Sequence, residues 1–139
     1  EMRFMNDNAE GVISEQDSGN VLKVAIVDDD VVIRRLLEKA FAGVSAKSVL
    51  FSNGVDFMHA IEDQEFDLVI LDIYIPDING FDILRTLQRD NFKAPLLIYS
   101  QATMRDAVVK SLSLGAKGYL IKPQKADVIV QKAMEVLHS

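Results

Sequence analysis

Short apolar runs alternate with amphipathic helical patterns along most of this chain. Five runs have the length and composition of β-strands, and they cover residues 22–27, 46–51, 67–71, 94–100 and 118–122. After each run, apolar residues recur every three or four positions, which is the spacing of one helical face. The first series is Ile33, Leu36, Leu37, Ala40 and Phe41, and the later ones begin near Val55, Phe81, Met104 and Val128. The pattern predicts five successive strand–helix units.

Strict alternation of strands and helices predicts an α/β fold, a doubly wound five-stranded parallel sheet, (βα)5, with helices on both faces. The run DLVIL at 67–71 is almost continuously apolar, as expected of a strand that is covered on both sides. Pro95 has no N–H to donate, so it can only open the strand in 94–100. Ligands of such sheets bind beyond the carboxyl ends of the strands.

Residues 1–20 are polar and follow neither period, so we expect a disordered leader before a single domain at 21–139. Five acids and one base give this segment a charge of −4, which leaves −2 of the total of −6 for the rest. Because no block of Lys and Arg forms a stripe, we expect no direct binding of nucleic acid by this domain.

Other compositional features narrow the classes further. The chain has no cysteine, which excludes disulfides, thiolate catalysis and cysteine-ligated zinc. No apolar stretch approaches the roughly 20 residues of a membrane-spanning helix, and no secretory signal is evident. We therefore expect a protein of the cytoplasm with no membrane partner.

Polar side chains follow four of the five predicted strands, at the point where each apolar run ends. Asp28 and Asp29 leave the first strand, Asp72 the third, Ser100 the fourth and Lys122 the fifth. The carboxyl ends of parallel strands meet at one edge of the sheet, so these five side chains are expected to lie together.

The chemistry of this set points to a metal and to phosphoryl transfer. Three converging carboxylates raise one another's pKa unless a cation lies among them. Oxygen ligands without His or Cys favour a hard cation such as Mg²⁺. A carboxylate beside Mg²⁺ and the Lys122 ammonium can attack a phosphoryl group, and Ser100 can donate a hydrogen bond to a phosphoryl oxygen.

At this point the chain, over about residues 22–138, resembles the response-regulator receiver domain of two-component signalling, which has a chemotaxis-regulator-like fold. The resemblance is carried by Asp28 and Asp29, by Asp72 in LVILDIYIPDINGFDIL, by Ser100, by Tyr119, and by Lys122 with Pro123. It implies the flavodoxin-like strand order 2-1-3-4-5 and a cis peptide bond before Pro123. Gln124 departs from the family, because many members have Phe after the Lys-Pro pair.

The resemblance also implies a function. Asp72 would accept a phosphoryl group from a histidine kinase or histidine phosphotransfer protein, and the domain would catalyse both its own phosphorylation and dephosphorylation without being a conventional enzyme. Mg²⁺ would be bound directly by Asp29, Asp72 and the backbone carbonyl of Tyr74, and by Asp28 largely through water. Ser100 and Tyr119 would form the switch.

The output is expected on the face made by the fourth helix, the fifth strand and the fifth helix, near Met104, Arg105, Tyr119 and Lys125. The downstream protein or domain is unknown, and a phosphorylation-dependent dimer is compatible with the family. Tyr74, two residues past Asp72, and Gln101, one past Ser100, border the mouth of the site in this family. We expect both to hinder an attacking water and to prolong the life of the phosphoryl group.

Simpler interpretations remain for single residues. Asp28 and Asp29 can act merely as caps of the first helix, as Asp30 is expected to do, and Tyr119 can be ordinary strand packing. Two alternatives concern the whole chain. A haloacid-dehalogenase-like phosphatase would use Asp28 as its nucleophile, and a receiver-like binding module would never be phosphorylated.

Overall fold

The computed structural model describes residues 21–139, and the leader expected at 1–20 lies outside the described residues. Five parallel strands form one sheet in the order β3-β2-β4-β5-β6, which confirms the expected order 2-1-3-4-5. The strands are β2 (Lys23–Val27), β3 (Lys47–Phe51), β4 (Leu68–Leu71), β5 (Leu96–Ser100) and β6 (Gly118–Ile121). The helices are α2 (Val31–Ala42), α3 (Gly54–Ala60), α4 (Gly80–Arg89), α5 (Arg105–Ser113) and α6 (Ala126–Leu137).

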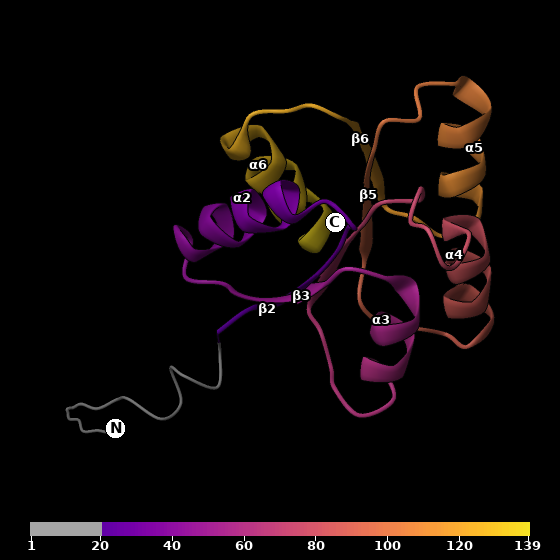
Figure 1. Ribbon diagram of the computed structural model, residues 1–139, viewed down its shortest axis with the longest axis horizontal. Helices are drawn as coiled ribbons and strands as arrows, with labels where there is room; N and C mark the ends of the chain where they lie inside the picture. Colours follow the sequence, from indigo (N-terminus) through magenta and orange to yellow (C-terminus); the bar gives the residue numbers. More distant parts are fainter. Residues whose placement is uncertain (1–20) are drawn as a thin grey trace.

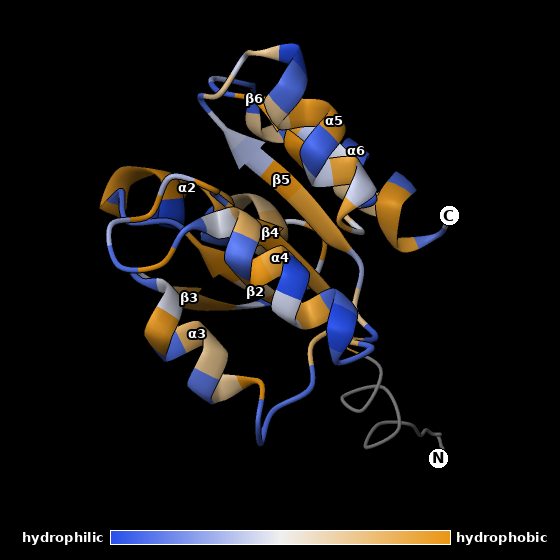
Figure 2. Ribbon diagram, turned by 90° about the vertical axis from the view of Figure 1, so that its right-hand side faces the viewer, coloured by the Kyte–Doolittle hydropathy of each residue, from blue (hydrophilic) through white to orange (hydrophobic). Residues whose placement is uncertain are grey.

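Helices cover both faces of the sheet, with α2 and α6 on one side and α3, α4 and α5 on the other (Figure 1). Each side has its own apolar core. One is built around Phe57, Leu84 and Ile98, and the other around Phe41, Leu97 and Ile129. Figure 2 shows the strands as mostly hydrophobic and the helices as striped, which is the pattern of a doubly wound fold. All four residues of β4 are buried, as the sequence predicted.

Helix starts follow the capping chemistry of the sequence. Asp30, Asn53 and Asn79 occupy the N-cap positions of α2, α3 and α4, and each side chain accepts a hydrogen bond from the first turn. Strand β5 begins at Leu96, directly after Pro95, as expected of a residue that cannot donate to the ladder. The cis peptide bond at Lys122–Pro123 is also present.

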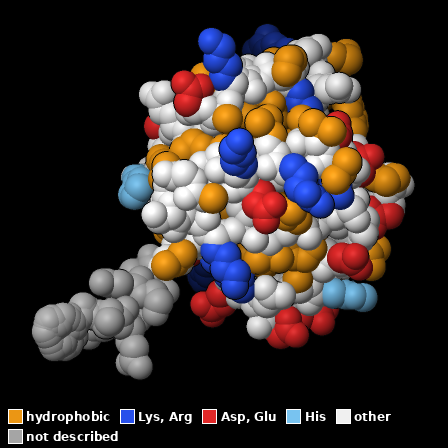
Figure 3. Space-filling view, turned by 60° about the vertical axis from the view of Figure 1, so that its left-hand side comes forward, with side chains coloured by type: hydrophobic (Ala, Val, Ile, Leu, Met, Phe, Trp, Pro, Cys, Tyr) orange, Lys and Arg blue, Asp and Glu red, His pale blue; other side chains and the backbone are white. Residues whose placement is uncertain are grey.

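The apolar helical pattern was a less accurate guide to burial. Leu36 and Val55 belong to predicted helical stripes, yet both are exposed, because the sheet needs only part of each stripe. On the molecular face shown in Figure 3, hydrophobic side chains lie among charged groups of both signs. None of the helices within residues 21–139 is long and apolar enough to cross a membrane.

Gly80, the first residue of α4, lets the loop after β4 approach that helix closely. A Cβ atom on Gly80 would lie 2.4 Å from the Ile73 Cα, which is closer than real side chains come. The Gly80 N–H donates to the Ile73 carbonyl over 3.1 Å. This contact fixes the backbone directly after Asp72, the predicted phosphoacceptor.

Candidate functional site

The predicted site residues come together at the carboxyl edge of the sheet. Backbone hydrogen bonds extend the ladders into this edge, because the Asp72 N–H donates to the Val27 carbonyl over 3.0 Å and the Lys122 N–H to the Ser100 carbonyl over 2.9 Å. Asp72 and Lys122 are therefore held by the same kind of backbone bonds that join the strands. Asp28, Asp72 and Ser100 are all buried there.

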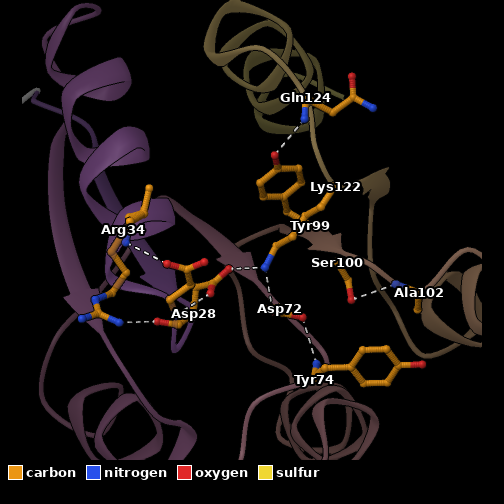
Figure 4. Close-up of polar contacts among 11 residues, drawn as sticks. Asp28, Arg34, Asp72, Tyr74, Tyr99, Ser100, Ala102, Lys122 and Gln124 are labelled. Atoms are coloured by element: carbon orange, nitrogen blue, oxygen red, sulfur yellow. Dashed lines mark hydrogen bonds and ion pairs between the residues drawn. The ribbon is translucent and has the colours of Figure 1, made fainter.

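Lys122 joins two of the carboxylates directly. Its Nζ lies 2.7 Å from Asp28 Oδ2 and 2.8 Å from Asp72 Oδ2, and all three side chains are largely shielded from solvent. Figure 4 shows the ammonium between the two acids. A pair at this distance forms charge-assisted hydrogen bonds, which are stronger than neutral ones.

The electrostatics of the cluster favour an additional cation. Burial raises the pKa of Asp28, although hydrogen bonds from Lys122 and from the Asp30 N–H oppose the effect. Burial alone would lower the pKa of Lys122, but the hydrogen bonds to Asp28 and Asp72 outweigh it and raise that pKa. The site contains one ammonium group and three carboxylates, so it keeps an excess of negative charge.

The three carboxylates have oxygen atoms within 4.8 Å of one another, which fits a shared hard cation. Asp28 already accepts hydrogen bonds on both oxygens, from the Asp30 N–H and from Lys122. Asp72 Oδ1 accepts from the Tyr74 N–H over 2.9 Å. Asp29 is exposed and lines the cavity beside Asp72. The donor set therefore fits direct ligation by Asp29 and a less direct role for Asp28.

Asp30 is separate from this cluster in its chemistry. Its Oδ1 accepts from the Val32 N–H over 2.8 Å, so it caps α2 as the sequence predicted. Asp28 has another geometry, because its Oδ2 accepts from Lys122 and its Oδ1 from the N–H of Asp30 itself, not from an amide in the first turn of α2. Helix capping alone thus accounts for Asp30 and not for Asp28.

A cavity of about 450 Å³ opens beside the acids and is lined by Asp29, Asp30, Asp72, Tyr74, Gln101 and Lys122. Tyr74 and Gln101 therefore border the cavity that holds Asp72, where the sequence placed them. The Tyr74 side chain is 62% exposed, and its ring is directed away from the Asp28–Lys122 pair (Figure 4). The effect of Tyr74 and Gln101 on the access of water to Asp72 stays a prediction.

Ser100 and Tyr119 are linked through one residue. The Tyr119 hydroxyl donates to the Ala102 carbonyl over 2.7 Å, and the Ala102 N–H donates to Ser100 Oγ over 3.4 Å. Burial raises the pKa of the Tyr119 hydroxyl, so it stays protonated and able to donate. Ser100 and the half-buried Tyr119 of β6 are thus joined by two hydrogen bonds through Ala102.

Sequence analysis missed two residues that hold this edge together. Arg34 Nη1 donates to the Asp28 backbone carbonyl over 2.7 Å, from one turn into α2. The Tyr99 hydroxyl accepts from the Gln124 N–H over 3.0 Å. The only signal for Tyr99 was a phenol in an otherwise aliphatic strand, since a buried hydroxyl requires a partner.

Comparison with known proteins identifies the family. The model of the response regulator receiver domain matches residues 24–134, and the chain belongs to this family. The chain is accordingly a phosphorylation-activated receiver domain of response regulators. This membership does not favour the haloacid-dehalogenase-like alternative, in which Asp28 would be the nucleophile.

Several curated proteins resemble the chain in sequence. The probable transcriptional regulatory protein SilR of Salmonella typhimurium is 37% identical over 102 residues, which cover 73% of this chain and 45% of SilR. The transcriptional regulatory protein CusR of Escherichia coli is 36% identical with the same coverage. The chain thus spans less than half the length of these relatives.

Solved structures agree on the fold. A CheY-like receiver domain protein from Methanospirillum hungatei superposes with a TM-score of 0.80 at 23% identity, over 86% of this chain and 95% of that one. The receiver domain of the Francisella response regulator 1452 has a TM-score of 0.79 at 22% identity, over 84% and 97% of the two chains. The expected chemotaxis-regulator-like fold is therefore confirmed.

Proposed function

We propose that Asp72 is the phosphoacceptor of this receiver domain, and that a histidine kinase or histidine phosphotransfer protein is its donor. The observation that carries the proposal is the position of Lys122, whose ammonium bonds both Asp28 and Asp72 at the wall of an open cavity. Asp72 therefore borders the open cavity on one side and a fixed positive charge on the other.

In the proposed reaction, a carboxylate oxygen of Asp72 attacks the phosphorus atom of a phosphohistidine. A P–O bond forms while the P–N bond breaks, and the imidazole nitrogen of the donor leaves with the bonding electron pair. Lys122 stabilises the charge that develops on the phosphoryl oxygens, because it already lies within hydrogen-bond distance of Asp72. Water attacking the same phosphorus later reverses the modification.

The acidic residues complete the proposed site. Asp29, Asp72 and the Tyr74 backbone carbonyl would hold Mg²⁺ directly, and Asp28 would act largely through water. When bound, Mg²⁺ would neutralise charge on the transferred phosphoryl group. Without a cation the excess of carboxylates over ammonium groups would oppose the approach of a phosphate.

The proposed switch begins at Ser100, whose hydroxyl would donate a hydrogen bond to a phosphoryl oxygen. The resulting shift of Ser100 would move Tyr119 through the hydrogen bonds that both residues make with Ala102. In the labels of Figure 1 the output face is α5–β6–α6, and it presents Met104, which is 72% exposed, together with Arg105 and Lys125. The partner there is an output domain or protein that this sequence does not identify. A phosphorylation-dependent dimer through this face and a cytoplasmic location belong to the same proposal.

The test is phosphorylation by a small donor. Incubation with phosphoramidate should add one phosphoryl group by intact mass in buffer with Mg²⁺, and none in buffer with a chelator. Asp72→Asn should remain unmodified, whereas the matched control Asp63→Asn, on an exposed loop, should react like the parent. Equal labelling of Asp72→Asn would contradict the proposal. Turnover of small phosphate esters lost in Asp28→Asn would instead favour the phosphatase, and no labelling at all would favour the binding module.

A further inference from the structure

Tyr99 is an unusual residue for a fully buried strand, because the residues before it in β5 are Leu96, Leu97 and Ile98. The side chain is only 1% exposed and packs in the core under α2 and α6. A phenol at such a site loses its hydration, so a buried tyrosine needs a hydrogen bond that an aliphatic residue would not need. The residue that needs this hydrogen bond directly precedes Ser100 in the chain.

The hydrogen bond of Tyr99 ties it to the segment after β6. Its hydroxyl oxygen accepts from the Gln124 N–H over 3.0 Å. Gln124 also folds back, since its Nε2 donates to the Ile121 carbonyl over 2.9 Å. The chain on the C-terminal side of Lys122 is therefore anchored on β5, as the Lys122 N–H is on the Ser100 carbonyl.

The aromatic ring of Tyr99 lies near the side-chain ammonium of Lys122. Its centroid lies 5.7 Å from the ammonium, within the range of a cation–π interaction. Figure 4 shows Tyr99 close to Lys122, with its hydroxyl directed at Gln124. A lysine has a flexible four-carbon stem, so a reaction that depends on its position benefits from contacts that restrict it.

From these contacts we infer that Tyr99 is a positioning residue for the phosphorylation of Asp72. Its hydroxyl fixes the backbone after Lys122 and its ring faces the Lys122 ammonium, so that this ammonium is held between Asp28 and Asp72. The inference rests on the proposed function, because it assigns to Lys122 the role of stabilising the phosphoryl group.

Two substitutions separate the contributions. Tyr99→Phe keeps the ring and removes the hydroxyl, and Tyr99→Leu removes both while filling much of the same space. Phe41→Leu is the matched control. Phe41 belongs to α2 and is an aromatic residue that is fully buried in the same core as Tyr99. This variant should lose stability without disturbing the Lys122 segment.

The measurements are hydrogen exchange at the Gln124 amide and the rate constant for phosphorylation by phosphoramidate at saturating Mg²⁺. In Tyr99→Phe we expect faster exchange at Gln124 and a rate constant lower by roughly three- to tenfold, the worth of one neutral hydrogen bond. The Mg²⁺ concentration for half-maximal rate should stay the same, because the carboxylates are untouched. Tyr99→Leu should be slower still, and Phe41→Leu should phosphorylate at the parent rate.

Other results overturn the inference. A parent-like rate constant in Tyr99→Phe would do so, whether or not Gln124 exchanges faster, and so would an equal loss in Phe41→Leu, which would mean general loosening of the core. If the parent chain takes up no phosphoryl group at all, the proposed function fails, and nitrogen NMR of the Lys122 ammonium in the absence of donor decides the inference. A resonance displaced in Tyr99→Phe but not in Phe41→Leu supports positioning, and an unmoved one contradicts it.

Discussion

The Lys122 ammonium donates a hydrogen bond of 2.8 Å to Asp72, although fifty residues separate the two in the chain. The contact exists because parallel strands β4 and β6 end at the same edge of the sheet. The same ammonium also holds Asp28 over 2.7 Å, so it is already in place when a phosphoryl group reaches Asp72. Transfer of that group would give Lys122 a new and more highly charged acceptor.

Removal of this ammonium should abolish most of the response to phosphorylation and leave the fold intact. A charge-assisted hydrogen bond to a phosphoryl oxygen contributes on the order of 1.5–3 kcal/mol, and only after modification. In Lys122→Ala, the NMR shifts that phosphorylation causes at Ser100 and Tyr119 should therefore disappear. Lys93→Ala, at an exposed position in the loop before β5, is the control and should respond like the parent. Persistence of these shifts in Lys122→Ala would show that the role assigned to Lys122 is wrong.

Asp28→Asn should stabilise the metal-free protein at neutral pH. Because the pKa of Asp28 is raised in the folded state, the folded chain binds more protons than the unfolded chain between the ordinary value of 3.8 and the raised folded-state pKa. Stability therefore falls as the pH rises through this window and stays lower above it. Asn keeps the shape and removes a charge from an acidic cluster, so we expect a gain of about 1 kcal/mol near neutrality.

Urea denaturation of Asp28→Asn and its parent, in buffer with a chelator, measures this gain at several pH values. The difference in the free energy of unfolding should shrink toward zero as the pH is lowered to about 3 and below, where Asp28 is largely protonated in both states. Asp63→Asn should show no such trend. A variant that is less stable than the parent at neutral pH would mean that the ion pair with Lys122 outweighs the repulsion.

Much of the fold was predictable because the strand–helix alternation is local. Continuous apolar runs marked the strands, Pro95 marked the start of β5, and the polar residues after the runs marked the site edge. The contacts of Tyr99 and Arg34 were not predictable in this way, because they join residues from different elements through hydrogen bonds that leave no periodic pattern. The exposure of Leu36 and Val55 escaped prediction for a related reason, since apolar spacing does not specify how wide a contact the sheet makes.

The roles of Asp28 and Asp29 illustrate the same limit at the site. The sequence placed both acids after the first strand, and in the structure Asp28 is buried against Lys122 whereas Asp29 is exposed. Both residues lie in the loop between β2 and α2, where side chains do not alternate regularly, so the sequence pattern does not specify which of them is buried. Only the assembled sheet shows which of the two meets the lysine.

Gly80→Ala should be strongly destabilising. The added Cβ would meet the Ile73 Cα at 2.4 Å, and backbone on both sides must move to relieve the contact. We expect a loss of about 2 kcal/mol or more in the free energy of unfolding, at the upper end of overpacking costs. Gly43→Ala is the control, because Gly43 has a helical φ of −63° at the end of α2. Thermal or urea unfolding measures both, and a loss in Gly80→Ala no larger than in Gly43→Ala would contradict the close approach.

Tyr74 and Gln101 should slow the hydrolysis of phosphorylated Asp72. Both line the cavity through which a water must approach in line with the P–O bond. Obstruction of that water can lower the rate by about tenfold, or about 1.4 kcal/mol. Dephosphorylation in excess Mg²⁺ should therefore be faster in Tyr74→Ala, in Gln101→Ala and most in the double variant, with Thr103→Ala unchanged. Slower loss in Gln101→Ala would show that its amide orients the water.

Asp72 should be the one residue of this domain that carries the phosphoryl group. An acyl phosphate is reduced by borohydride to an alcohol, which converts the modified aspartate to homoserine. After phosphorylation in Mg²⁺ and reduction, tandem mass spectrometry of the digested chain should find homoserine at position 72 and aspartate at positions 28, 29 and 30. Homoserine at position 28, or reduction at several of these positions in similar yield, would contradict the assignment of Asp72.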